Sequence, residues 1–254
     1  MRSIASSTAG SLGLLFLAIA TFVMPSSSQA APILWGAATG ISGDSDVSTA
    51  GTLLGAFNIG PPGVGDTTVN GVTFTGLALT GTNVTSGNFN FTASNFPSFN
   101  NVGIPDGAFN NLSSPYQTLL SSAGGTVGTD FLFTIGGLSL GQEYEFEWWS
   151  NDSAVSVSNL TRAKADTEIL LNSNPSGIKG GVGQFAIGHF TADTPNVGIL
   201  FSGNVALLNG FQFRQLDAAA PVPLPSSLWG SGVLLLTLAA RQVYRRRVAT
   251  MSAA

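Results

Sequence analysis

The chain of 254 residues has no cysteine, a single histidine and few charged side chains, which make up 9% of it. Without cysteine there is no disulfide, no thiolate metal site and no cysteine nucleophile. Basic residues are scarcest in the central body: residues 31–220 hold four of them against all thirteen acidic residues, a formal charge of −9. Such a surface repels phosphate, so we expect no nucleic-acid partner.

Residues 1–30 have the three parts of a secretory signal peptide. Arg2 gives a positive start, residues 12–24 form an apolar run, and Ser28 and Ala30 supply small side chains before the cleaved bond. The apolar run is short of the ~18 residues that a membrane span needs, which disfavours the alternative of a permanent N-terminal anchor. We therefore expect export with cleavage after Ala30, or else one residue later.

The C-terminal end also has three parts. Residues 217–225 form a Pro/Ala linker that ends in Val-Pro-Leu-Pro, residues 226–247 combine an apolar segment with an arginine cluster, and residues 248–254 form a tail. An apolar helix from Pro225 to Ala240 would reach roughly 24 Å, against a hydrocarbon core of ~30 Å. The arginines are expected to stay on the cytoplasmic side. An ordinary tail anchor is the alternative interpretation.

This segment resembles the PEP-CTERM sorting signal of bacteria, in its VPLP-type variant. The resemblance implies a membrane-embedded, exosortase-type processing enzyme as partner, transient membrane association through both termini, and delivery to the cell surface or an exopolysaccharide matrix. Leu224 stands where the Pro-Glu-Pro form of the signal has glutamate. The matching residues are Val222, Pro223, Leu224, Pro225, Trp229, Gly230, Arg241, Arg245, Arg246 and Arg247.

Strand patterns dominate the body. Residues 67–75 place β-branched side chains on both sides of Asn70-Gly71, a pair typical of a type I′ hairpin turn. Residues 142–148 alternate strictly, with glutamates on one face and aromatic side chains on the other. Other strands are expected near residues 87–92, 130–135, 166–171, 184–191, 196–202 and 205–214.

Helical patterns are short. Ser114 can cap a helix that contains Pro115 in its first turn, with Tyr116, Leu119 and Leu120 on one face. A second helical turn is expected around residues 49–54. Many short strands separated by Gly, Pro and Asn predict one mainly β domain over residues 31–216, a β-sandwich or jelly-roll-like fold.

The body also resembles a domain of other exported PEP-CTERM proteins, which implies a jelly-roll-like fold and no particular activity. The resemblance spans most of residues 33–216. It rests on residues 35–36, 41–49, 68–74, 137–144, 149–152 and 208–214.

Three glutamates give the sharpest enzymatic hypothesis. Glu143, Glu145 and Glu147 share a strand face about 6.5–7 Å apart, within the range of carboxylate pairs that hydrolyse glycosidic bonds. The triplet resembles the acidic strand of laminarinase- and lichenase-type glycanases, although the middle residue here is Glu rather than Asp. The alternative, which we favour, is a solvated outer face opposite an aromatic core, with no catalytic residue.

Other polar side chains have ordinary alternatives. Asp44 and Asp46, in a Gly/Ser loop, are candidates for a structural calcium ion, whereas two loop aspartates more often cap a turn. His189 lacks the Gly-x-Ser-x-Gly motif of a serine hydrolase, so we expect an ordinary polar side chain beside a strand. Trp148 and Trp149 point to opposite faces, so one is expected in the core, while the other lies exposed for stacking on sugar or buried under a loop.

Together these patterns predict an exported bacterial surface or extracellular-matrix protein with a structural or adhesive role and no cofactor beyond the calcium candidate. A carbohydrate-binding module is the second hypothesis, with extracellular polysaccharide as partner. A glycan hydrolase that uses Glu143, Glu145 and Glu147 is the third.

Overall fold

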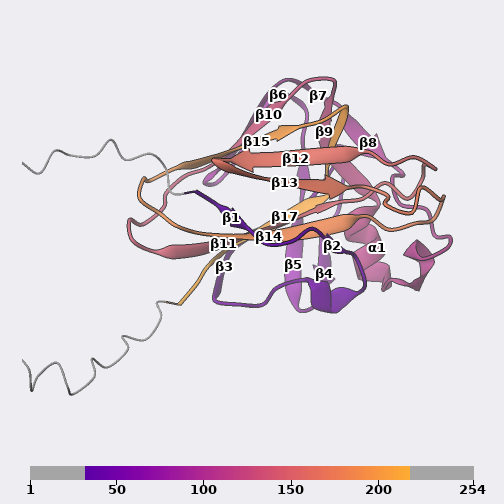
Figure 1. Cartoon of the computed structure of the whole chain (residues 1–254), viewed down its shortest axis with the longest axis horizontal. Coiled ribbons are helices and arrows are strands. Elements are labelled where there is room, and N and C mark those ends of the chain that lie inside the picture. Colours follow the sequence, from indigo (N-terminus) through magenta and orange to yellow (C-terminus); the bar gives the residue numbers. More distant parts are fainter. Residues whose placement is uncertain (1–31, 218–254) are drawn as a thin grey trace, which may run out of the picture.

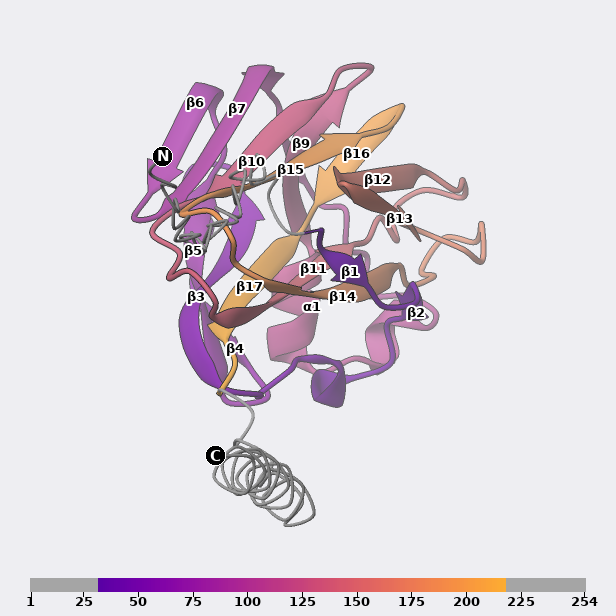
Figure 2. The ribbon, with the colours of Figure 1, turned by 60° about the vertical axis from the view of Figure 1, so that its left-hand side comes forward.

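A computed structural model describes residues 32–217 (Figure 1). The fold is mainly β, with 50% of residues in strands and 7% in helices, and it is β-sandwich-like, as the sequence predicted. Two large sheets pack face to face, and a third, small sheet lies beside them (Figures 1 and 2). No helix among residues 32–217 is long and apolar enough to cross a membrane. The expected signal peptide, sorting motif, apolar segment and arginine cluster lie outside the described residues.

The larger sheet has eight strands in the order β1-β14-β11-β17-β3-β5-β4, with β2 paired to β14. Its pairings are antiparallel except for the parallel pair of β3 and β5. The strands are β1 (Leu34–Trp35), β2 (Thr39–Gly40), β3 (Thr52–Gly60), β4 (Thr67–Val69), β5 (Val72–Ala78), β11 (Glu143–Ser150), β14 (Gln184–Thr191) and β17 (Gly210–Gln215).

The second sheet has six strands in the order β13-β12-β15-β10-β7-β6, and the small sheet has the order β16-β9-β8. The six strands are β6 (Gly81–Ser86), β7 (Phe89–Phe96), β10 (Phe131–Ile135), β12 (Leu160–Ala165), β13 (Thr167–Asn172) and β15 (Val197–Ser202). The small sheet consists of β8 (Ser98–Asn100), β9 (Ser122–Val127) and β16 (Val205–Leu208).

An aromatic core lies between the two large sheets. The alternating side chains of β10 and β11 point into it, as the sequence predicted, and Phe133 and Phe146 are fully buried. The Phe133 ring lies 4.5 Å from that of Phe91 on β7 and 4.9 Å from that of Phe211 on β17, measured between ring centroids. Because each such ring removes a large apolar area from water, this core is the main source of stability.

The larger sheet is covered on its other face as well. Helix α1 (Ser114–Leu120), the 3₁₀ turns η1 (Asp44–Asp46) and η2 (Phe109–Asn111), and a covering loop of residues 41–51 lie there (Figure 2). They enclose a second apolar cluster, which includes Phe74, Tyr116, Leu119 and Trp149. Side chains on both faces of β11 are therefore buried from Tyr144 to its end.

The structure tests three local predictions: a hairpin, a capped helix and a second helical turn. The β4–β5 hairpin is confirmed, with Asn70 and Gly71 at φ 48° and 75°. Helix α1 is confirmed with its buried face, but the capping residue is Ser113, whose side chain accepts a hydrogen bond from the Tyr116 amide. The helical turn expected at residues 49–54 is wrong, because β3 begins at Thr52 and pairs along its length with β17.

Candidate functional site

The glutamates of β11 do not form an open acidic face. Glu143 is exposed, but Glu145 is 4% exposed and Glu147 is 0% exposed. The prediction of a solvated outer face is therefore wrong for both, because the covering loop lies on that side of the sheet. The Ser48 amide of this loop donates a hydrogen bond of 3.0 Å to Glu147 Oε2.

Glu147 is the centre of a buried polar network. Gln212, which faces it across the β11–β17 ladder, donates through Nε2 to Glu147 Oε2 and, at 3.0 Å, to the Ser48 carbonyl. Glu147 Oε1 is buried and has no hydrogen-bond partner among the described residues. The two hydrogen bonds to the backbone of Ser48 hold the covering loop on the sheet, while Glu147 Oε1 receives no hydrogen bond from the described residues.

This setting changes the protonation of Glu147. Burial raises its pKa from 4.5 to about 8; the hydrogen bonds from Gln212 and Ser48 act in the opposite direction, and the charges of Glu145 and Asp46 add to the increase. At neutral pH the side chain is therefore mostly a neutral carboxylic acid. A neutral, fully covered acid has no contact with a substrate in solution.

Glu145 has mixed surroundings. Its Oε2 lies 3.9 Å from His189 Nε2 on β14, and its Oε1 is buried without a partner among the described residues. Arg214 faces Glu145 across the other ladder, and its guanidinium donates to the Ala50 carbonyl and, at 3.0 Å, to Gln212 Oε1. The half-exposed His189 is thus a strand residue of β14 next to a carboxylate.

Asp44 and Asp46 are engaged in local contacts of η1. Asp46 accepts hydrogen bonds from the Ser42 amide and hydroxyl, both at 2.6 Å, and from the Tyr116 hydroxyl at 3.3 Å. Asp44 accepts one of 2.5 Å from the Ser113 hydroxyl. These contacts cap the turn and fasten the covering loop to α1. Within residues 32–217, no group of three or more His, Cys, Asp or Glu side chains could hold a metal ion.

Both adjacent tryptophans are buried, so the exposed stacking platform considered from the sequence is absent at these two positions. Trp148 and Trp149 are each 0% exposed. Trp148 lies in the core between the sheets, with its ring centroid 5.0 Å from that of Phe201. Trp149 lies under α1, where its indole nitrogen donates a hydrogen bond of 2.8 Å to the Tyr116 hydroxyl.

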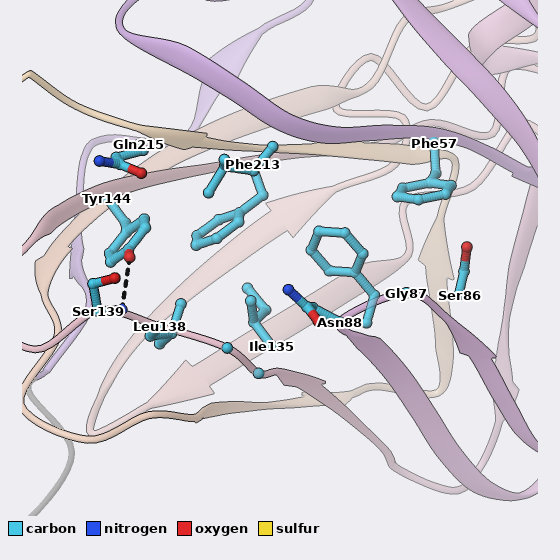
Figure 3. Close-up of a pocket in the computed structure, with 14 residues that line it drawn as sticks. Phe57, Ser86, Gly87, Asn88, Ile135, Leu138, Ser139, Tyr144, Phe213 and Gln215 are labelled. Carbon is cyan, nitrogen blue, oxygen red and sulfur yellow. Dashed lines mark hydrogen bonds between the residues drawn. The ribbon is translucent and has the colours of Figure 1, made fainter.

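A cavity of about 410 Å³, here called the end pocket, opens between the two large sheets at one end of the sandwich (Figure 3). Five segments line it: β3, the β6–β7 turn, the end of β10 with the loop after it, the start of β11 and the end of β17. The lining residues are Leu54, Phe57, Ser86, Gly87, Asn88, Phe89, Ile135, Gly136, Gly137, Leu138, Ser139, Tyr144, Phe213 and Gln215.

Packed aromatic rings form one side of the end pocket. The Tyr144 and Phe213 rings stack with centroids 5.1 Å apart, and Phe89 meets Phe57 edge-on at 5.3 Å. Gly55 makes this possible, because a Cβ atom there would come within 2.7 Å of the Phe89 ring. The sequence marked Tyr144 as a core residue and gave no signal that this end of the core is open.

The opposite side of the end pocket is built from two turns. The Gly136 amide donates a hydrogen bond of 2.8 Å to the Asn88 carbonyl, which joins the turns to each other. Gly137 has φ 71°, and a Cβ atom there would lie 2.7 Å from the Asn88 amide nitrogen. Glycine thus permits both the backbone conformation and the close approach of Asn88.

Comparisons with known proteins give little further information. No protein-family model and no curated protein matches the chain. Two solved structures of an exo-β-1,3-galactanase from Phanerochaete chrysosporium with β-1,3-galactotriose align with a TM-score of 0.29 and 16% identity. Each alignment covers 56% of this chain and 30% of the galactanase chain. A likeness at this level carries no argument about fold or function.

Proposed function

We propose that this chain is an exported bacterial surface or extracellular-matrix protein with a structural or adhesive role and no enzymatic activity. Its C-terminal segment, similar to a PEP-CTERM signal, sorts the protein and is cut by an exosortase-type enzyme. The body is a jelly-roll-like member of the β-sandwich class. Its strongly acidic composition suits a soluble domain outside the cell.

The burial of Glu145 and Glu147 is the observation that carries the non-enzymatic part of the proposal. A glycosidase needs two carboxyl groups that flank the scissile bond. Here Glu143 is exposed, Glu145 is almost covered and Glu147 is sealed by Ser48 and Gln212. Glu147 therefore serves to hold the covering loop, and the hydrolase hypothesis is left without a reachable pair of carboxyl groups.

A carbohydrate-binding module is the second candidate, and the end pocket favours it. The pocket combines aromatic walls with neutral polar side chains, which is the usual make-up of small-molecule sites. Binding of this kind is compatible with an adhesive role. The two candidates differ in whether the body recognises a defined sugar.

The sorting proposal is tested by replacing Val222-Pro223-Leu224-Pro225 with alanines and comparing the cell fractions of the two proteins. The original protein is expected at the cell surface or in the medium without Arg245–Arg247, and the variant in the membrane with these residues. A matched control carries two alanines at Pro195 and Asn196, in an exposed turn of the body. Identical fractionation and identical C-termini in all three proteins would contradict the proposal.

A further inference from the structure

The end pocket is lined without any charged side chain, although the body as a whole is acidic. An ionised ligand would lose its hydration there and gain no partner of opposite charge, which is costly. The pocket therefore selects against charged ligands. At about 410 Å³, its volume is near the lower limit of typical small-molecule sites, so it suits one ring rather than a long chain.

The polar groups that line the end pocket have hydrogen-bonding capacity that no described residue uses; Asn88 is exposed, Ser86 and Gln215 are half-buried, and Tyr144 lies deepest, at 2% exposure. The Tyr144 hydroxyl accepts a hydrogen bond of 2.9 Å from the Ser139 amide, and no acceptor among the described residues takes its proton (Figure 3). The side chains of Asn88, Ser86 and Gln215 also form no hydrogen bond with other described residues. Hydroxyl and amide groups can both donate and accept, which matches a ligand that is rich in hydroxyl groups.

The apolar surface of the same pocket requires a ligand with an apolar face. Phe57 is half-buried, and Leu54 at the rim is 46% exposed, so part of this apolar surface is in contact with water. Covering it releases that water and stabilises the complex. A pyranose ring has this combination of properties, because C–H groups point from its faces and hydroxyl groups from its edge.

From these properties we propose that the end pocket binds a single neutral pyranose, either free or at the end of a glycan. The ring lies against Leu54, the Tyr144 hydroxyl donates to a sugar oxygen, and the Asn88 amide contacts a hydroxyl group at the mouth. This inference rests on the proposed adhesive role and gives it a ligand class.

The test measures sugar binding by the full chain in lipid nanodiscs, with saturation-transfer NMR and empty nanodiscs as the blank. The probes are the methyl glycosides of glucose, galactose and mannose, together with methyl glucuronide and phenol. At least one neutral glycoside is expected to bind saturably, in the millimolar range typical of so small a contact, and the glucuronide at least tenfold more weakly.

Two variants test whether the sugar binds in the end pocket. Tyr144→Phe removes one hydroxyl and Asn88→Ala one exposed amide; each is expected to weaken binding about fivefold, the value of one neutral hydrogen bond. Asn204→Ala is the matched control, because Asn204 is an equally exposed asparagine at the opposite end of the β10–β15 ladder. It is expected to leave binding unchanged. Asn88→Ala changes only an exposed side chain, so the test stands even if Tyr144→Phe misfolds.

Three results would overturn the inference: no saturable signal with any neutral glycoside, binding that both pocket variants leave unchanged, or phenol or the glucuronide bound more tightly than every neutral glycoside. The outcome is independent of the sorting test. A protein that is sorted normally but binds no glycoside refutes the sugar site alone, and one that binds a glycoside but is never processed refutes the sorting proposal alone.

Discussion

The substitution Glu147→Gln should make stability less dependent on pH. Glutamine has nearly the same shape, and its oxygen can accept the hydrogen bonds from Ser48 and Gln212. It carries no ionisable group. The covering loop should therefore stay in place, and only the electrostatic cost of Glu147 should disappear.

The size of the effect follows from the raised pKa of Glu147. Below pH 4.5 the acid is protonated in both the folded and the unfolded protein, so it brings no charge penalty. Between pH 4.5 and about 8 only the unfolded protein releases the proton, and the free energy of unfolding falls as pH rises. At about 1.4 kcal/mol per pKa unit, the total loss is about 5 kcal/mol. Above pH 8 the loss is complete and constant.

Urea unfolding of a segment covering residues 31–217 measures this directly, with fluorescence of the buried Trp148 and Trp149 as the probe. Near pH 4.5 the variant and the original should differ by about 1 kcal/mol or less, the scale of a single hydrogen bond. By pH 8.5 the variant should be more stable by several kcal/mol. The pKa of Asp152 is also raised by burial, but Asp152 is present in both proteins and its effect cancels in the difference.

The control is Glu143→Gln, which changes an exposed glutamate on the same strand. Its difference from the original protein should stay within about 0.5 kcal/mol at every pH, as expected for a surface substitution. Parallel pH profiles for Glu147→Gln and the original would refute the reasoning, since they would mean that Glu147 is not held neutral in the folded protein.

Three further predictions concern the core, a buried hydrogen-bond network and a turn, and urea unfolding measures the free energy of unfolding in each case. Asn209→Ala should lower the free energy of unfolding by about 3 kcal/mol or more, because the Asn209 side chain accepts from one buried backbone amide and shares its two N–H groups among three carbonyl oxygens. A loss below about 1 kcal/mol would count against this. Phe133→Ala should cost about 3–5 kcal/mol through a cavity in the aromatic core, with an unchanged midpoint as the contrary result. Gly71→Ala should cost about 1 kcal/mol because φ is 75°, whereas Gly65→Ala, in open space at ordinary φ, should be nearly neutral; equal effects would refute the turn argument.

The sequence pattern correctly predicted those features of the fold that depend on residues close together in the chain. The alternation in residues 142–148 correctly placed Tyr144, Phe146 and Trp148 in the core. It could not show what lies on the other face of β11. Ser48, which covers Glu147, is 99 residues away in the sequence, and the alternation of apolar and polar residues along one strand does not reveal so distant a contact.

The same reason explains one wrong local prediction and one question that the sequence left open. Residues 49–54 contain a short apolar stretch that suits a helical turn. They form the start of β3 instead, because β3 pairs with β17, a strand more than 150 residues later in the sequence. For Trp149, whose strand neighbour Trp148 fills the core, the sequence left both exposure and burial under a covering segment open. Trp149 is buried because α1 covers that face. The end pocket was missed because it requires two turns, at residues 86–89 and 135–139, to meet in space.

Mass spectrometry of the intact protein from the surface fraction of its producing cells tests the central claim most directly. The proposal predicts a chain that begins at Ala31, or at Pro32 with the alternative cleavage, and ends near Val222–Pro225 without Arg241 and the three later arginines. A full-length chain of 254 residues that remains in the membrane would contradict it.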